Sequence, residues 1–92
     1  GMAYFLATLF CLGKARAGQH KFAAAESNLL EAQPILLATR GPQHPETREC
    51  TQALVDLYSA WDAKDPGKGH QAKASDWKSK LKDLDAPASA TG

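Results

Sequence analysis

The side chains that bind metals best are few and widely separated along this chain. They are three histidines and two cysteines: His20, His44, His70, Cys11 and Cys50. None of them forms a Cys-x-x-Cys or His-x-x-x-His pair, the spacings by which proteins usually present zinc ligands. The sequence therefore predicts no metal site.

Residues for covalent or acid–base catalysis lack the setting that such chemistry needs. Ser27, Ser59 and Ser75 do not stand in a Gly-x-Ser-x-Gly turn, and no glycine loop is followed by Lys-Ser or Lys-Thr. Asp62 and Asp65 lie beside a polar loop rather than in an apolar pocket, so they are not placed for acid–base work. We expect no enzymatic activity and no cofactor.

Length and charge limit the classes of protein to consider. With 92 residues, 43% of them hydrophobic, the chain is one small globular domain or a fragment of a longer protein. There are 11 basic and 10 acidic residues, for a net charge of +1, and aspartates interleave with the lysines of the C-terminal quarter. We therefore expect no nucleic-acid partner and no anionic membrane.

The apolar start of the chain, residues 3–12, is predicted to be a core helix. It has no basic residue before the apolar run, unlike a signal peptide, and it is too short to cross a bilayer. Gly1 before Met2 is interpreted as a cloning remnant. Cys11 and Cys50 fall among apolar neighbours, so we expect buried or half-buried thiols in a reducing, cytoplasmic compartment. A disulfide bond between Cys11 and Cys50 is possible only if their helices pack side by side.

Helical periodicity runs through the chain, with a central turn from Gly41 to Arg48. Gly41 and Pro42 end one helix there, and Pro45 suits the first turn of the next. His44 is expected to cap that helix or to bond neighbouring backbone. Further breaks divide each half again. We predict an all-α fold with helices over residues 3–17, 21–39, 45–63 and 70–84.

Each predicted helix carries an apolar stripe. Leu30 and Leu37 are expected to extend the stripe of the second helix, and Pro34 is expected to kink or divide that helix. The four stripes are Phe5, Leu9 and Leu12 with Arg16; Phe22, Ala25, Leu29 and Ala32; Leu54, Leu57, Tyr58 and Trp61; and Ala74, Trp77, Leu81 and Leu84.

The two halves align with an offset of 42 residues, which pairs Leu12 with Leu54. The first half reads Leu9-x-x-Leu12-Gly13-x-x-Arg16, then Phe22, then Ala25-x-x-x-Leu29-x-x-Ala32, and it resembles a tetratricopeptide repeat (TPR). The central Gly-Pro-x-His-Pro-x-Thr is similar to the long repeats of the kinesin light chain type, which recur in bacterial multi-repeat proteins. The second half resembles the last repeat of such arrays, some of which form the C-terminal half of bacterial serine/threonine kinases.

The resemblance implies two stacked helix–turn–helix hairpins, a TPR-like α–α superhelix. The hairpins would span about residues 3–39 and 45–84 within a domain of residues 2–84, followed by a flexible tail, residues 85–92. Three or more repeats are usually needed for stability. We therefore expect an N-terminal extension or a second copy of the chain to cover the open apolar end.

The resemblance also implies that the first helix of each hairpin lines a concave groove. Lys14 and Asp56 would occupy equivalent places with opposite charge, which suits a peptide with one charge of each sign. Phe10 and Lys14 stand where a carboxylate clamp has its Lys and Asn, so a chaperone C-terminus is not predicted. The groove positions are Ala7, Phe10, Lys14, Ala17, Glu49, Gln52, Asp56 and Ser59.

These features predict a protein–protein interaction module, a scaffold or adaptor that binds a protein or peptide in the groove. One alternative is self-assembly, in which the apolar end docks a second copy to form a homodimer. The other is a C-terminal regulatory repeat region of a larger bacterial enzyme, such as a serine/threonine kinase.

Overall fold

The structure, a computed structural model, describes the backbone of residues 2–85 and the side chains of residues 8–84. Over this range the chain is helical and has no strand, which confirms the predicted all-α fold. Each predicted helix end lies within one residue of the observed one. Asp85 ends the last helix, and the rest of the predicted tail lies outside the described residues. The helices are α1 (Met2–Gly18), α2 (Phe22–Arg40), α3 (Pro45–Lys64) and α4 (His70–Asp85).

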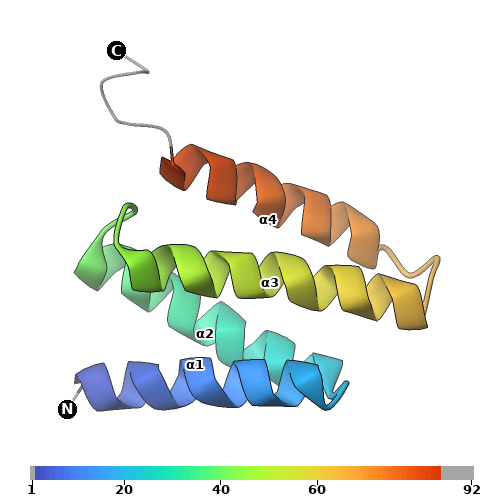
Figure 1. The fold of residues 1–92 in the computed structure, drawn as a ribbon, viewed down its shortest axis with the longest axis horizontal. Coiled ribbons are helices and arrows are strands. Elements are labelled where there is room, and N and C mark those ends of the chain that lie inside the picture. Colours follow the sequence, from blue (N-terminus) through green and yellow to red (C-terminus); the bar gives the residue numbers. More distant parts are fainter. Residues whose placement is uncertain (1, 86–92) are drawn as a thin grey trace.

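The helices form two hairpins that stack on each other. α1 packs against α2, and α3 packs against α4. The hairpins meet mainly through α2 and α3, because α1 touches α3 only slightly. Figure 1 shows the helices succeeding one another across the molecule, with α1 at one edge and α4 at the other.

The central turn is built as the sequence predicts. Gly41 has φ 91°, and its N–H bonds back to the Leu37 carbonyl oxygen, so α2 ends there. His44 caps α3, since its Nδ1 accepts a hydrogen bond from the Glu46 N–H at 3.1 Å. The Glu46 carboxylate also lies 3.8 Å from Arg40 Nε across the turn, at the exposed surface.

Pro34 does not divide α2, so that alternative is wrong. The helix runs from Phe22 to Arg40 with Pro34 inside it, and the proline lies on the exposed side. Its missing N–H leaves one carbonyl of the preceding turn without a helical partner. Water can satisfy a carbonyl at an exposed position, so the helix continues.

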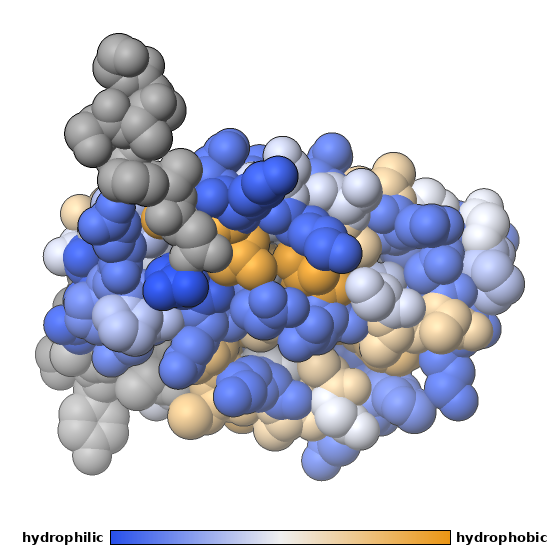
Figure 2. Space-filling view, turned by 45° about the horizontal axis from the view of Figure 1, so that its top comes forward, coloured by the Kyte–Doolittle hydropathy of each residue, from blue (hydrophilic) through white to orange (hydrophobic). Residues whose placement is uncertain are grey.

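Buried apolar side chains from all four helices form one core. Leu12 faces outward, with 39% of its surface exposed, although the sequence places it in the apolar stripe of its helix. Leu30 and Leu37 also stay 38% and 39% exposed. The core residues are Leu9, Phe22, Ala25, Leu29, Ala32, Leu36, Cys50, Leu54, Leu57, Tyr58 and Ala74. The molecular face shown in Figure 2 is largely polar, and the strongly apolar side chains on that face gather near its centre.

Gly13 explains why Leu12 is turned outward. A Cβ atom on Gly13 would lie 2.7 Å from Leu29 Cδ2 and 2.8 Å from its Cγ. Leu29 is fully buried. Only a residue without a side chain lets α1 lie this close to Leu29, so Gly13 rather than Leu12 faces α2.

A row of stacked rings joins the two hairpins near the ends of α2, α3 and α4. Trp61 lies 5.6 Å from Phe22 and 4.0 Å from His70, measured between ring centroids, and each pair is nearly parallel. His70 is buried, and its Nδ1 has no hydrogen-bond partner among the described residues. The sequence did not predict this role for His70. Stacked rings stabilise a fold by more than the apolar area that they bury.

A hydrogen bond and an ion pair accompany this row. The Tyr58 hydroxyl donates to Glu26 Oε2 at 2.7 Å, and Lys73 Nζ lies 3.7 Å from the same oxygen. Burial, and then the hydrogen bond to Glu26 and its charge, raise the pKa of Tyr58. The three side chains come from α2, α3 and α4, so they connect the hairpins across their interface.

The two cysteines differ in environment. Cys50 is fully buried, and its thiol donates to the Leu29 carbonyl oxygen at 3.7 Å, whereas Cys11 is exposed. The predicted burial of Cys11 is therefore wrong, since α1 turns that side outward together with Leu12. Both thiols are free. Burial raises the pKa of the Cys50 thiol to about 12.

Among the described residues, no helix is both long enough and apolar enough to cross a membrane.

We predict opposite effects for alanine at two glycines of α1. Gly13→Ala should lower the free energy of unfolding by about 1–3 kcal/mol, because the new methyl group overlaps the buried Leu29. Gly18→Ala should raise it by about 0.5 kcal/mol, because Gly18 is helical and a methyl group there would meet no atom within 4 Å. Urea unfolding followed by circular dichroism measures both. Equal effects at the two positions would contradict this account of Gly13.

We predict that the two thiols react at different rates with an aromatic disulfide reagent. Cys11 should react promptly at pH 8, and Cys50 should react only when the chain unfolds, because its thiol is buried and stays protonated. The stability that burial of the Cys50 thiol contributes should be complete below about pH 9 and should fall as the pH rises toward 12. The control is Cys11→Ser, which should leave a single slow thiol. A fast thiol in that variant would show that Cys50 is accessible.

Candidate functional site

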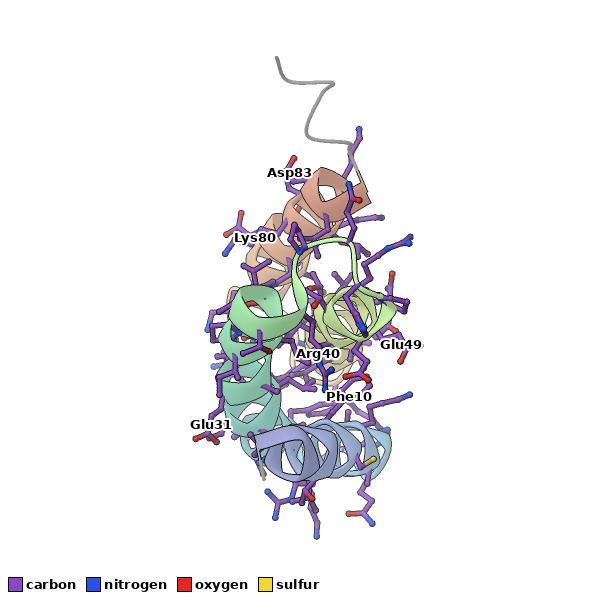
Figure 3. The ribbon with its side chains drawn as sticks, turned by 90° about the vertical axis from the view of Figure 1, so that its left-hand side faces the viewer. Phe10, Glu31, Arg40, Glu49, Lys80 and Asp83 are labelled. Atoms are coloured by element: carbon purple, nitrogen blue, oxygen red, sulfur yellow. The ribbon has the colours of Figure 1, made fainter. Side chains whose placement is uncertain are left out.

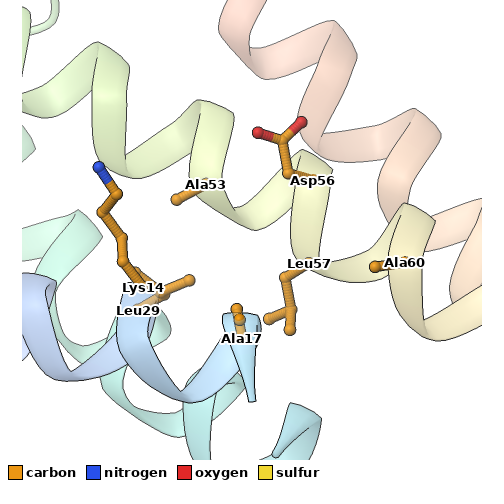
Figure 4. Close-up of a pocket in the computed structure, with 8 residues that line it drawn as sticks. Lys14, Ala17, Leu29, Ala53, Asp56, Leu57 and Ala60 are labelled. Carbon is orange, nitrogen blue, oxygen red and sulfur yellow. The ribbon is translucent and has the colours of Figure 1, made fainter. Parts of the chain in front are cut away.

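A groove opens between α1 and α3, and α2 closes its back. It holds a pocket of about 270 Å³ whose wall is mainly apolar. Figure 4 shows the side chains that line it, which come from the three helices. They are Lys14, Ala17 and Gly18 of α1, Leu29 of α2, and Ala53, Asp56, Leu57 and Ala60 of α3. The pocket therefore belongs to both hairpins and requires their stacking.

The pocket exists because its walls are small while its floor is packed. Leu29 and Leu57, almost completely buried, form the floor. The walls are alanines and a glycine, which leave space that larger side chains would fill. α1 and α3 also touch only slightly, so the groove stays open between them. Packing of α2 against both helices holds the floor in place.

Two oppositely charged side chains stand at the rim. Lys14 rises from α1 and Asp56 from α3, at positions that the 42-residue offset makes equivalent (Figure 4). The Lys14 ammonium lies 5.2 Å from the centre of the Phe10 ring. Asp56 Oδ1 accepts a hydrogen bond from Gln52 Nε2 at 2.9 Å. Among the described residues, neither charge is in an ion pair.

The structure brings some of the predicted groove residues together and separates others. Lys14, Ala17 and Asp56 line the pocket. Phe10 is half-buried against the core and lies between α1 and α3 in Figure 3. Gln52 is exposed and reaches the pocket only through Asp56.

Two other predicted groove residues, Glu49 and Ser59, lie outside the pocket. Glu49 and Ser59 are exposed on α3 and are absent from its lining; Figure 3 shows Glu49 at the outer side of α3. The Ala7 side chain lies outside the described residues. One side of α3 thus turns farther from the groove than the repeat pattern predicts.

Sequence reasoning missed the alanines of α3. Ala53 and Ala60 line the pocket with Leu57, and the three stand at the i, i+4, i+7 spacing of one helix face. That stripe of small and apolar residues was a signal in the sequence. It predicts a helix surface without saying whether a neighbour covers it, and only the stacking leaves it open.

A second hollow lies between α2 and α4. Its volume is about 300 Å³, and its apolar residues are Leu37, Trp77 and Leu84. Lys80 also lines it, with Nζ 4.2 Å from the centre of the Trp77 ring. Gln33 and Asp83 complete the lining. This hollow belongs to the opposite side of the hairpin stack from the groove.

The arrangement is suited to binding through apolar contact and charge. In the described part of the chain, no three His, Cys, Asp or Glu side chains gather closely enough to hold a metal ion. The groove instead offers an apolar floor, small walls and two fixed charges. An apolar surface with a few polar groups at its edge is typical of binding pockets and of protein interfaces.

Comparison of the chain with protein-family models, with curated proteins and with solved structures gave no match. Function is therefore inferred from the groove and from the residues that build it.

Proposed function

We propose that this chain is a protein–protein interaction module, a scaffold or adaptor that binds a peptide or a protein segment in the groove between α1 and α3. The observation that carries the proposal is an apolar pocket made by three helices of both hairpins, with a lysine and an aspartate at its rim. The resemblance to tetratricopeptide repeats favours the same use. The proposal includes no catalytic step and no cofactor.

The size of the pocket favours a peptide over a small-molecule ligand. Pockets for small molecules usually enclose about 300–1,000 Å³ and bury most of the ligand. The pocket of about 270 Å³ lies at the lower limit of that range and is open on one side. It suits one apolar side chain while the rest of the segment runs along the groove. An affinity in the micromolar range or weaker is expected, because the contact area is small.

A selection from a random peptide library displayed on phage tests the proposal. Enriched peptides should bind the unmodified chain and should lose at least about ten-fold in affinity for the Ala60→Trp variant, because the indole would fill the pocket. Ala60 is exposed, so this substitution leaves the core intact. Isothermal titration calorimetry measures the affinities.

Ala72→Trp is the matched control. Ala72 is also an exposed helical alanine, but it lies on α4 and lines neither hollow. Enriched peptides should bind this variant as they bind the unmodified chain. Peptides that bind both variants equally, or a selection without enrichment, would refute the groove as a binding site.

Self-assembly is a second candidate, supported by large apolar side chains at the surface. Leu12 and Leu30 are 39% and 38% exposed, and they come from the two helices of the first hairpin. A large apolar side chain at the surface can be buried by contact with another chain.

We predict a concentration-dependent dimer that is weakened by Leu12→Glu. The carboxylate would have to be buried in the interface, while the fold should survive because Leu12 is outside the core. Leu9 does not serve for this test, since it is buried. Size-exclusion chromatography with light scattering gives the mass of the particle in solution. Lys78→Glu, at an exposed position of α4, controls for the change of charge. Monomers at every concentration, or dimers unaffected by Leu12→Glu, would exclude this assembly.

A further inference from the structure

We propose that the groove selects peptides in which an acidic and a basic side chain flank an apolar one. The acidic group would pair with Lys14, the basic group with Asp56, and the apolar side chain would enter the pocket between them. This inference rests on the proposed function and specifies the chemistry of its ligand.

The first support is that a neighbour on its own helix positions each rim charge. Lys14 lies over the ring of Phe10, four residues earlier in α1, at 5.2 Å. Asp56 is held by Gln52, four residues earlier in α3, through a hydrogen bond of 2.9 Å. The 42-residue offset pairs Phe10 with Gln52 and Lys14 with Asp56. The two hairpins thus use equivalent positions to present opposite charges.

The second support is that neither charge is neutralised within the described residues. Lys14 interacts with an aromatic ring, and Asp56 accepts from an amide, so neither contact supplies an opposite charge. Asp56 also has a second carboxylate oxygen for a ligand. A bound segment with matching charges would gain electrostatic complementarity at both rims.

The third support is the apolar lining of the pocket that also holds the two charges. Ala53, Ala60 and Leu57 line it with a surface that offers no polar side chain. A charged or amide side chain there would lose water without gaining a partner. The pocket therefore presents a cation, an anion and an apolar lining, and the ligand should carry the complementary groups.

Peptides of one charge sign fit this groove less well. An acidic peptide would be attracted by Lys14 and repelled by Asp56, and a basic peptide would meet the reverse. Each exposed charge contact changes affinity by roughly two- to five-fold, and repulsion opposes binding by a similar factor. The groove therefore discriminates modestly, by the balance of two contacts.

Five peptides with blocked ends test the inference. Two are mixed, Glu-Ala-Val-Ala-Lys and Lys-Ala-Val-Ala-Glu. Three are references, with Glu at both ends, Lys at both ends or Gln at both ends. Binding is followed in low salt by NMR shifts of the Ala53 and Ala60 methyl groups, which line the pocket. One mixed peptide should bind about three-fold or more tightly than every reference, and moderate salt should reduce the difference.

Charge-reversed variants then identify the groups responsible. Lys14→Glu should shift the preference to the peptide with Lys at both ends, and Asp56→Lys should shift it to the peptide with Glu at both ends. Lys78→Glu and Asp76→Lys are matched controls, because they make the same charge changes at exposed positions of α4 away from the groove. The controls should keep the preference for the mixed peptide.

The outcomes separate this inference from the function on which it rests. Equal binding of all five peptides, or a preference unchanged by the Lys14 and Asp56 variants, overturns the charge selection. If Ala60→Trp still abolishes that binding, the groove remains a peptide site. No methyl shift with any peptide at millimolar concentration overturns both the charge selection and the proposed function.

Discussion

The contact between Gly13 and Leu29 is the constraint on which the rest of this structure depends. A Cβ on Gly13 would lie 2.7 Å from Leu29, so α1 and α2 approach closely only because the residue is glycine. Leu29 also forms part of the floor of the groove, and its carbonyl oxygen accepts a hydrogen bond from the Cys50 thiol of α3. One residue of α2 therefore sets the position of α1, supports the pocket and contacts α3.

α2 and α3 join the hairpins through buried polar groups as well as apolar ones. The Thr47 hydroxyl donates to the Leu36 carbonyl oxygen at 3.2 Å, and the Thr51 hydroxyl donates to the Thr47 carbonyl oxygen at 2.8 Å. Gln33 Nε2 lies 3.5 Å from Thr51 Oγ1, the longest of these bonds. Buried polar groups that have partners impose one relative placement of the helices, whereas apolar contact alone tolerates sliding.

The groove is a consequence of how little α1 and α3 touch. Both helices are anchored to α2, so they need no close contact with each other, and small residues between them leave a pocket. Near the loops the interface is built differently. There the stacked rings of Phe22, Trp61 and His70 fill the space between the helices. The chain thus combines a rigid end of packed rings with an open groove of alanines. A binding surface needs both, since an open groove on a loose scaffold would lose affinity when ordered.

The sequence by itself determined the local structure of this protein. Apolar periodicity, with Gly41, His44 and Pro45 at the central turn, placed four helices to within a residue, because helix ends depend on neighbouring residues. Only the tertiary structure decided which face of each helix is covered. Leu12 and Cys11 face water because Gly13 faces Leu29. Ala53 and Ala60 line a pocket because α1 does not pack closely against α3. Periodicity shows which face of a single helix is apolar. Burial depends on how close a second helix lies, and that distance is set by contacts between residues far apart in the sequence.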